Sequence, residues 1–212
     1  MKLYTYPLSR YAQKVLIALY EKQIAFEPIN LYPGDPADRA KLLEITPLGK
    51  VPVLVLDNGW KIPESSIIVE YLDGQGSGPR LIPEDRDLAR QTRFHDRIAD
   101  LYITESYGTI KRDQHAETKD PERVHMAHER LDALFVGIDR HLANRTWVMG
   151  ESFTAADCSL IPALADHALH PIDRFEHLAA YYERALGRPS VARVQRELAA
   201  WLAANATTAK AS

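Results

Sequence analysis

The stretch Leu48-Gly-Lys-Val-Pro-Val-Leu54, followed ten residues later by Glu64-Ser65-Ser66, is the most informative part of this sequence for fold and function. Pro52 stands directly before a β-branched strand and cannot donate a main-chain hydrogen bond to a neighbouring strand. This places the proline at a strand edge or a turn and makes it a candidate for the cis form. A cis bond there would leave the N–H and C=O of Val51 free to pair with an extended, peptide-like ligand.

Glu64 and Ser65 lie at the first turn of the helix that follows this strand region. The free N–H groups and the positive end of the helix dipole favour an anion there, and the Ser65 hydroxyl adds a donor. Glu64 is placed to meet an ammonium group, and Lys50 is placed to hold a second carboxylate. Together they predict a site for a small peptide with charged ends. When each residue is considered alone, a structural role is the alternative. Glu64 and Ser65 would then cap the helix, and Lys50 would be a solvated surface charge.

Around this stretch, strand and helix patterns alternate from Lys2 to about Asp73. Strand patterns cover residues 2–5, 25–30, 53–56 and 60–62, and helical patterns cover residues 11–22, 35–45 and 64–72. The order β-α-β-α-β-β-α predicts a small mixed sheet, because a β-α-β unit gives parallel neighbours and the turn Asp57-Asn58-Gly59 gives an antiparallel hairpin. We therefore expect an α/β, thioredoxin-like N-terminal domain.

The glycine-rich stretch Gly74-Gln-Gly-Ser-Gly-Pro79 ends this alternation, and only helical periodicity follows Pro83. The longest helical runs cover residues 85–112 and 120–143. We predict a thioredoxin-like domain over residues 1–78, a linker over 79–86 and an all-α C-terminal domain over 87–212. The glycines follow a helix instead of joining a strand to a helix, which argues against a nucleotide-binding loop.

Composition narrows the classes of partner. The 212 residues include 26 basic and 29 acidic side chains, so no basic surface for nucleic acid is expected. Cys158 is the only cysteine and excludes a disulfide within the chain, which favours a reducing compartment. No run of 18 or more apolar residues is present, and the first residues lack the apolar stretch of a signal peptide. We expect a cytoplasmic location and no membrane partner.

The segments Pro47-Leu-Gly-Lys-Val-Pro-Val-Leu54 and Glu64-Ser-Ser-Ile-Ile-Val-Glu-Tyr-Leu72 resemble the glutathione-binding motifs of the cytosolic glutathione transferase family. The resemblance covers nearly the whole chain. In the helical half, the segment Gly150-Glu-Ser-Phe-Thr-Ala-Ala-Asp-Cys158 is similar to that family's helix-capping motif, in which Thr154 and Asp157 form a capping box.

The resemblance implies that glutathione is a co-substrate and gives each motif residue a role. It implies a cis bond at Pro52, main-chain pairing at Val51, recognition of the γ-glutamyl group by Glu64 and Ser65, and a contact from Lys50 to the glycine carboxylate. It also implies a homodimer.

Ser9 is the predicted catalytic residue. Conjugation needs the thiolate of glutathione, so the enzyme must lower the pKa of the thiol, and one hydroxyl at a helix start suffices. Ser9 follows Pro7-Leu8 and directly precedes a predicted helix. The spacing Ser9-x5-Val15 resembles the catalytic-serine subgroup, although Arg10 stands where several members have an uncharged residue. The alternatives are a plain N-cap role for Ser9, or activation by a tyrosine: Tyr6 first, then Tyr4 and Tyr11.

Tyr11, Tyr102, Ser106 and Tyr107 are expected either to line the pocket for a hydrophobic or moderately polar electrophile or to serve as packing residues. The histidine pairs at 125/128 and 167/170 have i, i+3 spacing, but nothing completes a metal site, so we expect no metal and surface or interdomain histidines. Cys158 is expected to be a small core residue.

The predicted function is a glutathione S-transferase that activates the thiol and transfers it to an electrophilic small molecule, with detoxification as one role. Isomerisation, dehalogenation or ether cleavage with glutathione are alternatives within the resemblance. A ligand carrier that keeps the fold without the chemistry is the non-enzymatic alternative.

Overall fold

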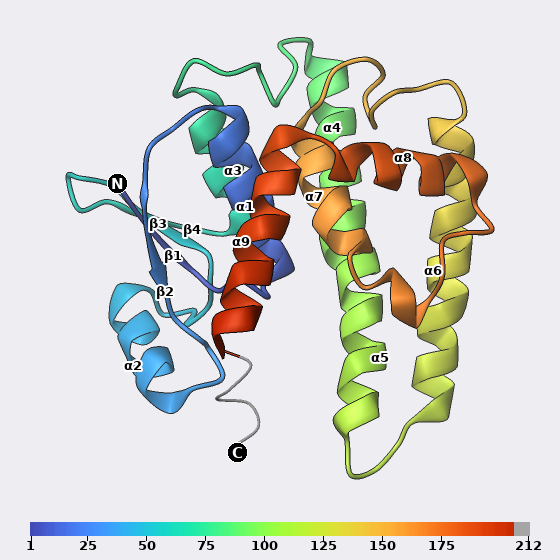
Figure 1. Ribbon diagram of the computed structural model, residues 1–212, viewed down its shortest axis with the longest axis horizontal. Helices are drawn as coiled ribbons and strands as arrows, with labels where there is room; N and C mark the ends of the chain where they lie inside the picture. Colours follow the sequence, from blue (N-terminus) through green and yellow to red (C-terminus); the bar gives the residue numbers. More distant parts are fainter. Residues whose placement is uncertain (206–212) are drawn as a thin grey trace. The chain divides into compact units, whose positions relative to one another are not determined.

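The computed structural model describes residues 1–205, and the chain divides into two compact units (Figure 1). Unit 1 comprises Met1–Pro79 together with the chain from Gly187 on, and unit 2 comprises Arg80–Leu186. The last helix, α9 (Pro189–Asn205), therefore belongs to unit 1, whereas the sequence pattern groups it with the helical domain. The boundaries at residues 78 and 86 stay predictions.

Unit 1 contains a four-stranded mixed sheet in the order β2-β1-β3-β4. Its strands are β1 (Lys2–Thr5), β2 (Glu27–Asn30), β3 (Val53–Val55) and β4 (Lys61–Pro63). β1 runs parallel to β2 and antiparallel to β3, and β3 runs antiparallel to β4. The predicted β-α-β connection and the predicted hairpin are both confirmed.

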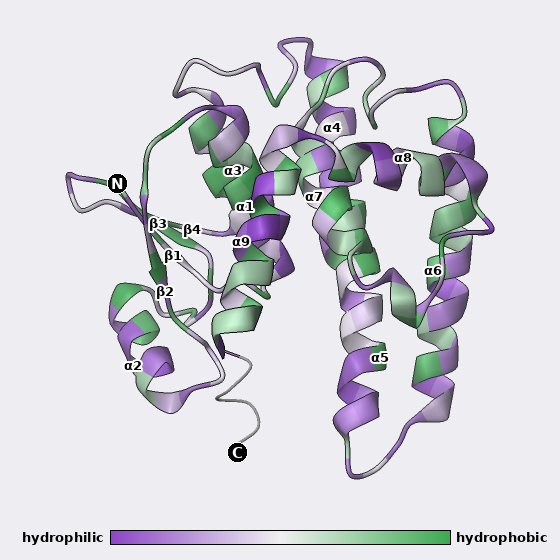
Figure 2. Cartoon of the chain, in the orientation of Figure 1, coloured by the Kyte–Doolittle hydropathy of each residue, from purple (hydrophilic) through white to green (hydrophobic). Residues whose placement is uncertain are grey.

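Three helices accompany the sheet in the order that the sequence predicts: α1 (Arg10–Glu21), α2 (Pro36–Ile45) and α3 (Ser65–Asp73). α1 packs against α3 and α9. Every residue of α1 from Ala12 to Leu19 is buried, so this helix has no solvent-facing side over two turns. Figure 2 shows the hydrophobic character of α1 and α3. The core of unit 1 therefore forms around α1.

Unit 2 is built from helices, with one isolated β-bridge recorded between Trp147 and Gly150. It consists of α4 (Arg86–Ile98), a π-helical segment η1 (Ala99–Thr104), α5 (Glu105–His115), α6 (Pro121–Leu142), α7 (Ala155–Leu164), a 3-10 turn η2 (His167–Leu169) and α8 (Glu176–Leu186). The run predicted over residues 85–112 is thus helical but contains a π segment that periodicity does not reveal. All residues of α7 are buried, and α7 packs against α4 and α8. The fold class is confirmed: an α/β thioredoxin-like domain followed by a helical domain.

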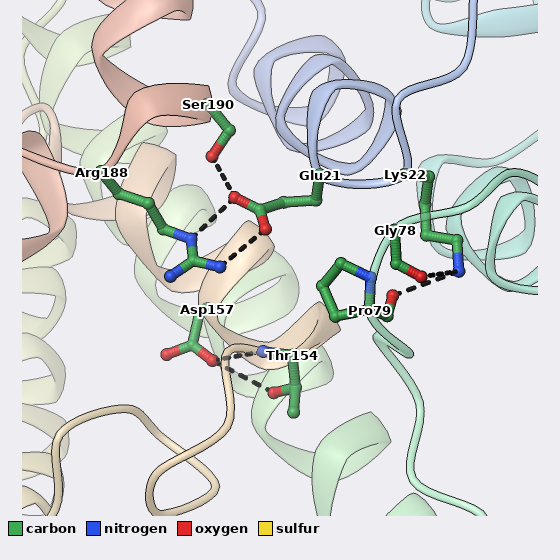
Figure 3. A network of polar contacts seen from close by, with 8 residues as sticks. All are labelled: Glu21, Lys22, Gly78, Pro79, Thr154, Asp157, Arg188 and Ser190. Carbon is green, nitrogen blue, oxygen red and sulfur yellow. Dashed lines mark hydrogen bonds and ion pairs between the residues drawn. The ribbon is translucent and has the colours of Figure 1, made fainter.

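Asp157 organises the start of α7. Its carboxylate accepts hydrogen bonds from the Thr154 N–H (2.8 Å) and hydroxyl (3.1 Å), which gives the predicted capping box (Figure 3). The same carboxylate accepts from the Val148 N–H at 2.9 Å and from the Tyr181 hydroxyl at 3.0 Å. Complete burial raises the pKa of Asp157 to about 6, and the four donors act in the opposite direction. Cys158 beside it is buried, as expected.

Two adjacent residues at the end of α1 hold distant segments of unit 1 (Figure 3). Glu21 accepts two hydrogen bonds of 2.7 Å from the Arg188 guanidinium and one from the Ser190 hydroxyl, which fixes the start of α9. Lys22 donates to the carbonyls of Gly78 (3.2 Å) and Pro79 (3.1 Å). Since Glu21 is nearly buried, this bidentate pair is partly shielded from water.

Within residues 1–205, no helix is long and apolar enough to cross a membrane.

We predict that Asp157→Asn lowers the free energy of unfolding by about 3 kcal/mol, because an amide offers one acceptor oxygen and turns its NH₂ toward buried donors. The measurement is urea denaturation followed by circular dichroism at a pH well above 6, where the carboxylate is ionised. Asp85→Asn is the matched control. Asp85 caps α4 through the Asp87 and Leu88 N–H groups, and asparagine caps equally well, so its effect stays within about 0.5 kcal/mol. Equal effects of the two substitutions would contradict the role given to Asp157.

We further predict that Glu21→Gln lowers the free energy of unfolding by about 2 kcal/mol, because the Arg188 guanidinium then keeps no charged partner at Glu21. Glu84→Gln serves as its control, since Glu84 pairs with Arg80 on the exposed surface and is expected to contribute less than about 0.5 kcal/mol. A Glu21→Gln protein as stable as Glu84→Gln would show that the contact does not anchor α9.

Candidate functional site

The Val51–Pro52 peptide bond is cis, as the sequence resemblance implies. Pro52 is buried and Val51 is half-buried. β3 begins at Val53, so the main chain of Val51 lies just outside the strand pairing. Lys50, the residue before, is exposed. Lys50 and the main chain of Val51, which takes no part in the strand pairing, therefore lie directly before β3.

Glu64 lies at the entrance to α3 in an uncommon backbone conformation, with φ 69° and ψ 114°. A non-glycine residue with positive φ carries strain of about 1–3 kcal/mol, and such strain is concentrated at functional sites. Glu64 is exposed, and its carboxylate makes no capping hydrogen bond to the helix. Helix capping, the structural alternative for this side chain, is therefore not its role.

Ser65 and Ser66 open α3, where helix geometry leaves the first main-chain N–H groups without acceptors inside the helix. Ser65 is buried, and the Ser66 hydroxyl accepts a 2.8 Å hydrogen bond from the Lys14 ammonium group. Lys14 is only 1% exposed. Its positive charge adds to the positive end of the α3 dipole, so the first turn of α3 is a favourable place for an anion.

Ser9 is the N-cap of α1, and its hydroxyl oxygen accepts a 3.2 Å hydrogen bond from the Ala12 N–H. Its own N–H donates to the Tyr6 carbonyl at 2.9 Å. The buried Gln13 side chain donates to the Pro7 carbonyl at 2.7 Å and so fixes the loop before the helix. Capping uses the oxygen of Ser9 as an acceptor, which leaves the hydroxyl hydrogen available to donate to an anion.

Tyr6 is held by aromatic contacts within unit 1. Its ring stacks on Tyr32 with centroids 4.8 Å apart and meets the edge of Trp201 at 5.5 Å. Burial, and secondarily the proximity of Tyr32, raise the pKa of the Tyr6 hydroxyl above its ordinary value. Tyr4 lies in β1 and Tyr11 in the first turn of α1.

The residues predicted to line an electrophile pocket fall in different environments. Tyr11, in unit 1, is half-buried, and Tyr102, in η1 of unit 2, is exposed. Ser106 and Tyr107 are buried in α5 of unit 2, where the Tyr107 hydroxyl donates to the His170 carbonyl at 3.2 Å. The contact from Tyr107 serves packing within unit 2. A role for these four residues in binding an electrophile stays a prediction.

Lys14, Gln13 and Ser66 are parts of the site that the sequence alone does not assign to it. A signal for the first two was present: a lysine and a glutamine lie in a helical run that is otherwise apolar from Ala12 to Leu19. Charged and amide groups inside such a run need partners. Their partners, 52 residues away for Lys14 and six residues away for Gln13, are known only from the structure.

The histidines form a different arrangement from the predicted pairs. The Nδ1 atoms of His128 and His170 lie 2.8 Å apart, and His170 Nε2 lies 2.6 Å from an Asp132 oxygen. His170 is buried and so is not a surface residue, and its contact with Asp132 compensates its burial. In the described part of the chain, no group of three or more His, Cys, Asp or Glu residues is arranged to hold a metal ion.

Comparison with known proteins matches both parts of the chain to one family. Residues 3–80 match the family model described as "Glutathione S-transferase, N-terminal domain", and residues 113–184 match "Glutathione S-transferase, C-terminal domain". A "Glutathione S-transferase" of Pseudomonas putida is 32% identical over 158 residues, which is 74% of this chain and 70% of the relative.

Two further comparisons extend this result. A crystal structure of a glutathione S-transferase from Methylobacillus flagellatus with glutathione bound has a TM-score of 0.84 at 27% identity, covering 91% of this chain and 98% of that one. A "Stringent starvation protein A homolog" of Coxiella burnetii is 29% identical over 165 residues, 77% of this chain and 74% of the relative. From the matched family models and the Pseudomonas relative, we conclude that this chain belongs to the glutathione S-transferase family.

Proposed function

We propose that the protein binds glutathione along β3 and the start of α3 and transfers its thiolate to an electrophilic small molecule. The main chain of Val51, before cis-Pro52, pairs with the cysteinyl part of the peptide, and the first turn of α3 at Ser65 receives the γ-glutamyl carboxylate. Glu64 receives the ammonium group, and Lys50 the glycine carboxylate.

We propose Ser9 as the residue that stabilises the thiolate. The single observation that carries this proposal is the hydrogen bond from the Ala12 N–H to the Ser9 hydroxyl oxygen. By accepting at its oxygen, the hydroxyl becomes a stronger donor through its hydrogen, and it stands at the positive end of α1. Both effects favour the charged form of a nearby thiol.

The proposed reaction is nucleophilic substitution or addition. The thiolate lone pair forms a carbon–sulfur bond, and either a leaving group departs with its bonding electrons or, in addition, the neighbouring atom takes up the electron pair and a proton. The electrophile is hydrophobic or moderately polar, and holding it beside the thiolate lowers the barrier by proximity. Isomerisation, dehalogenation and ether cleavage begin from the same thiolate. A cytoplasmic homodimer remains the expected form.

A second candidate is a ligand carrier that keeps the fold without turnover. The relative named "Stringent starvation protein A homolog" favours keeping this candidate, because its name describes no transferase. Assays with an aryl halide, an epoxide and an isothiocyanate separate the two candidates. Saturable glutathione binding without turnover of any of the three would favour the carrier.

We predict that Ser9→Ala raises the pKa of the bound glutathione thiol by about 1–2 units, the equivalent of one hydrogen bond to a charged group. Titration of the ultraviolet absorbance of the thiolate in the binary complex measures this value. Ser9→Thr keeps both the hydroxyl and the N-cap and should retain the wild-type pKa, and Tyr6→Phe should do the same. A pKa that is unchanged in Ser9→Ala and raised in Tyr6→Phe would assign the role to Tyr6.

We also predict that Glu64→Gln weakens glutathione binding by about tenfold, because the amide keeps the shape of the side chain but loses its attraction to the ammonium group. Calorimetry with glutathione and with its analogue lacking the α-amino group tests the assignment. The analogue should bind wild type and Glu64→Gln equally. Glu27→Gln, at an exposed position of β2, is the control and should bind both ligands as wild type does. An equal loss for both ligands in Glu64→Gln would contradict the ammonium contact.

A further inference from the structure

The turn between β3 and β4 contains the dipeptide Asn58-Gly59, whose chemistry the proposed reaction does not use. Residues 57–60 are all exposed, and a β-carbon added to Gly59 would meet no atom within 4 Å outside its immediate neighbours in the chain. Two main-chain hydrogen bonds of 2.9 Å close the turn, from the Gly59 N–H to the Leu56 carbonyl and from the Leu56 N–H to the Trp60 carbonyl. The turn is thus open to water.

The side-chain amide of Asn58 is folded back along the main chain of Gly59. Its oxygen Oδ1 accepts a 2.9 Å hydrogen bond from the Trp60 N–H, two residues further on, which is an Asx turn. This N–H draws electron density from the Asn58 amide and stands at the oxygen that becomes negative when the amide carbon Cγ is attacked. The contact therefore makes Cγ a better electrophile and stabilises the intermediate of attack.

We propose that Asn58 is a site of spontaneous modification, which converts it to isoaspartate through a cyclic imide. The Gly59 nitrogen forms a bond to Asn58 Cγ, and the amide nitrogen of Asn58 leaves as ammonia with the proton that the Gly59 nitrogen loses. Water then opens the ring. Its addition at the main-chain carbonyl carbon leaves Gly59 attached through Cγ, which is isoaspartate, and its addition at Cγ gives aspartate. Glycine has no side chain to obstruct the attack.

The hydrogen bond from the Gly59 N–H to the Leu56 carbonyl sets the rate. While it is formed, the Gly59 nitrogen is held away from attack, so the ring closes when the turn opens locally, which costs little for an exposed loop. The turn also makes an ion pair of 2.8 Å between Asp57 and the Met1 amino group, and exposed pairs of this kind contribute little. We expect conversion over days to weeks, more slowly than in an unstructured peptide of the same sequence.

The consequence of the modification rests on the function proposed above, because this turn joins two parts of the proposed glutathione site. β3 begins two residues after Val51, and β4 ends at Pro63, directly before Glu64. Three residue pairs align the two strands, and the register of so short a hairpin is fixed by its turn. Isoaspartate adds one carbon to the main chain of the turn, a step of about 1.5 Å. The modification should therefore displace Val51 relative to Glu64 and weaken glutathione binding.

Ageing of the full chain at mildly alkaline pH and physiological temperature tests the modification. Trypsin cleaves after Lys50 and Lys61, so Asn58 lies in one short peptide. The mass of this peptide should rise by the difference between a carboxylic acid and an amide, and an isoaspartyl methyltransferase should then methylate it. Absence of methylation after several weeks would overturn the proposal.

Asn144 is the internal control in the same sample. It is also exposed in a turn, and the N–H of the next residue, Arg145, donates to the carbonyl three residues before it at 3.0 Å, as the Gly59 N–H does. The side chain of Arg145 obstructs attack at the position where glycine leaves it open. We expect no change at Asn144 in the time that converts Asn58. Equal conversion of the two asparagines would contradict the special reactivity given to Asn58.

Calorimetry with glutathione tests the consequence. The isoaspartate form, separated by ion exchange through its added negative charge, should bind glutathione about two- to tenfold more weakly than fresh wild type, the range for one misaligned hydrogen bond. Asn58→Asp adds the same charge without lengthening the main chain and should bind as fresh wild type does. Asn58→Gln would have to close a larger ring, so its affinity should not change on ageing.

Equal affinities of the isoaspartate form and fresh wild type would overturn the effect on the site. Weakening of the same size in Asn58→Asp would also overturn it, since charge and not main-chain length would then be the cause. A fresh wild type that does not bind glutathione would refute the proposed function and this consequence with it. The conversion of Asn58 is judged separately, by the mass and methylation of its peptide.

Discussion

The burial of α1 from Ala12 to Leu19 is the constraint on which the rest of unit 1 depends. A helix enclosed for two turns is positioned by its neighbours, and those of α1 include α3 and α9. Its ends are therefore fixed as firmly as its centre. At one end Ser9 caps the helix, and at the other Glu21 fixes the start of α9. The position of the proposed catalytic hydroxyl is a consequence of where this helix lies.

Enclosing a helix so completely also buries polar side chains that sit on it, and each is compensated by a specific partner. Lys14 donates to Ser66 at the start of α3, and Gln13 donates to the Pro7 carbonyl in the loop before Ser9. Leaving either group unpaired would cost about 1–3 kcal/mol or more. The hydrogen bonds that compensate the burial of Lys14 and Gln13 therefore also position the residues of the proposed site. Stability and site geometry in this region are not separable, because the same hydrogen bonds serve both.

Local patterns in the sequence predict the strands, most helices, the mixed sheet and the capping box at Thr154 and Asp157, because each depends on residues close together in the chain. The turn at Asp57-Asn58-Gly59 and the cis bond before Pro52 are of the same kind. The return of α9 to unit 1 is not local: it depends on Glu21 meeting Arg188, 167 residues away. The π segment at Ala99–Thr104 and the contact between His128 and His170 are likewise set by tertiary packing, for which helical periodicity carries no signal.

The contact between Lys14 and Ser66 gives the proposed mechanism a geometric requirement. Lys14 lies one turn into α1 and Ser66 at the second position of α3, so their hydrogen bond brings the first turns of the two helices together. Each helix start is a positive pole. One pole is proposed to face the thiolate of glutathione and the other its γ-glutamyl carboxylate, two anions of a single ligand. The spacing between those poles is set by the packing of α1 on α3. The core that stabilises unit 1 therefore also determines which anionic ligand fits both poles at once.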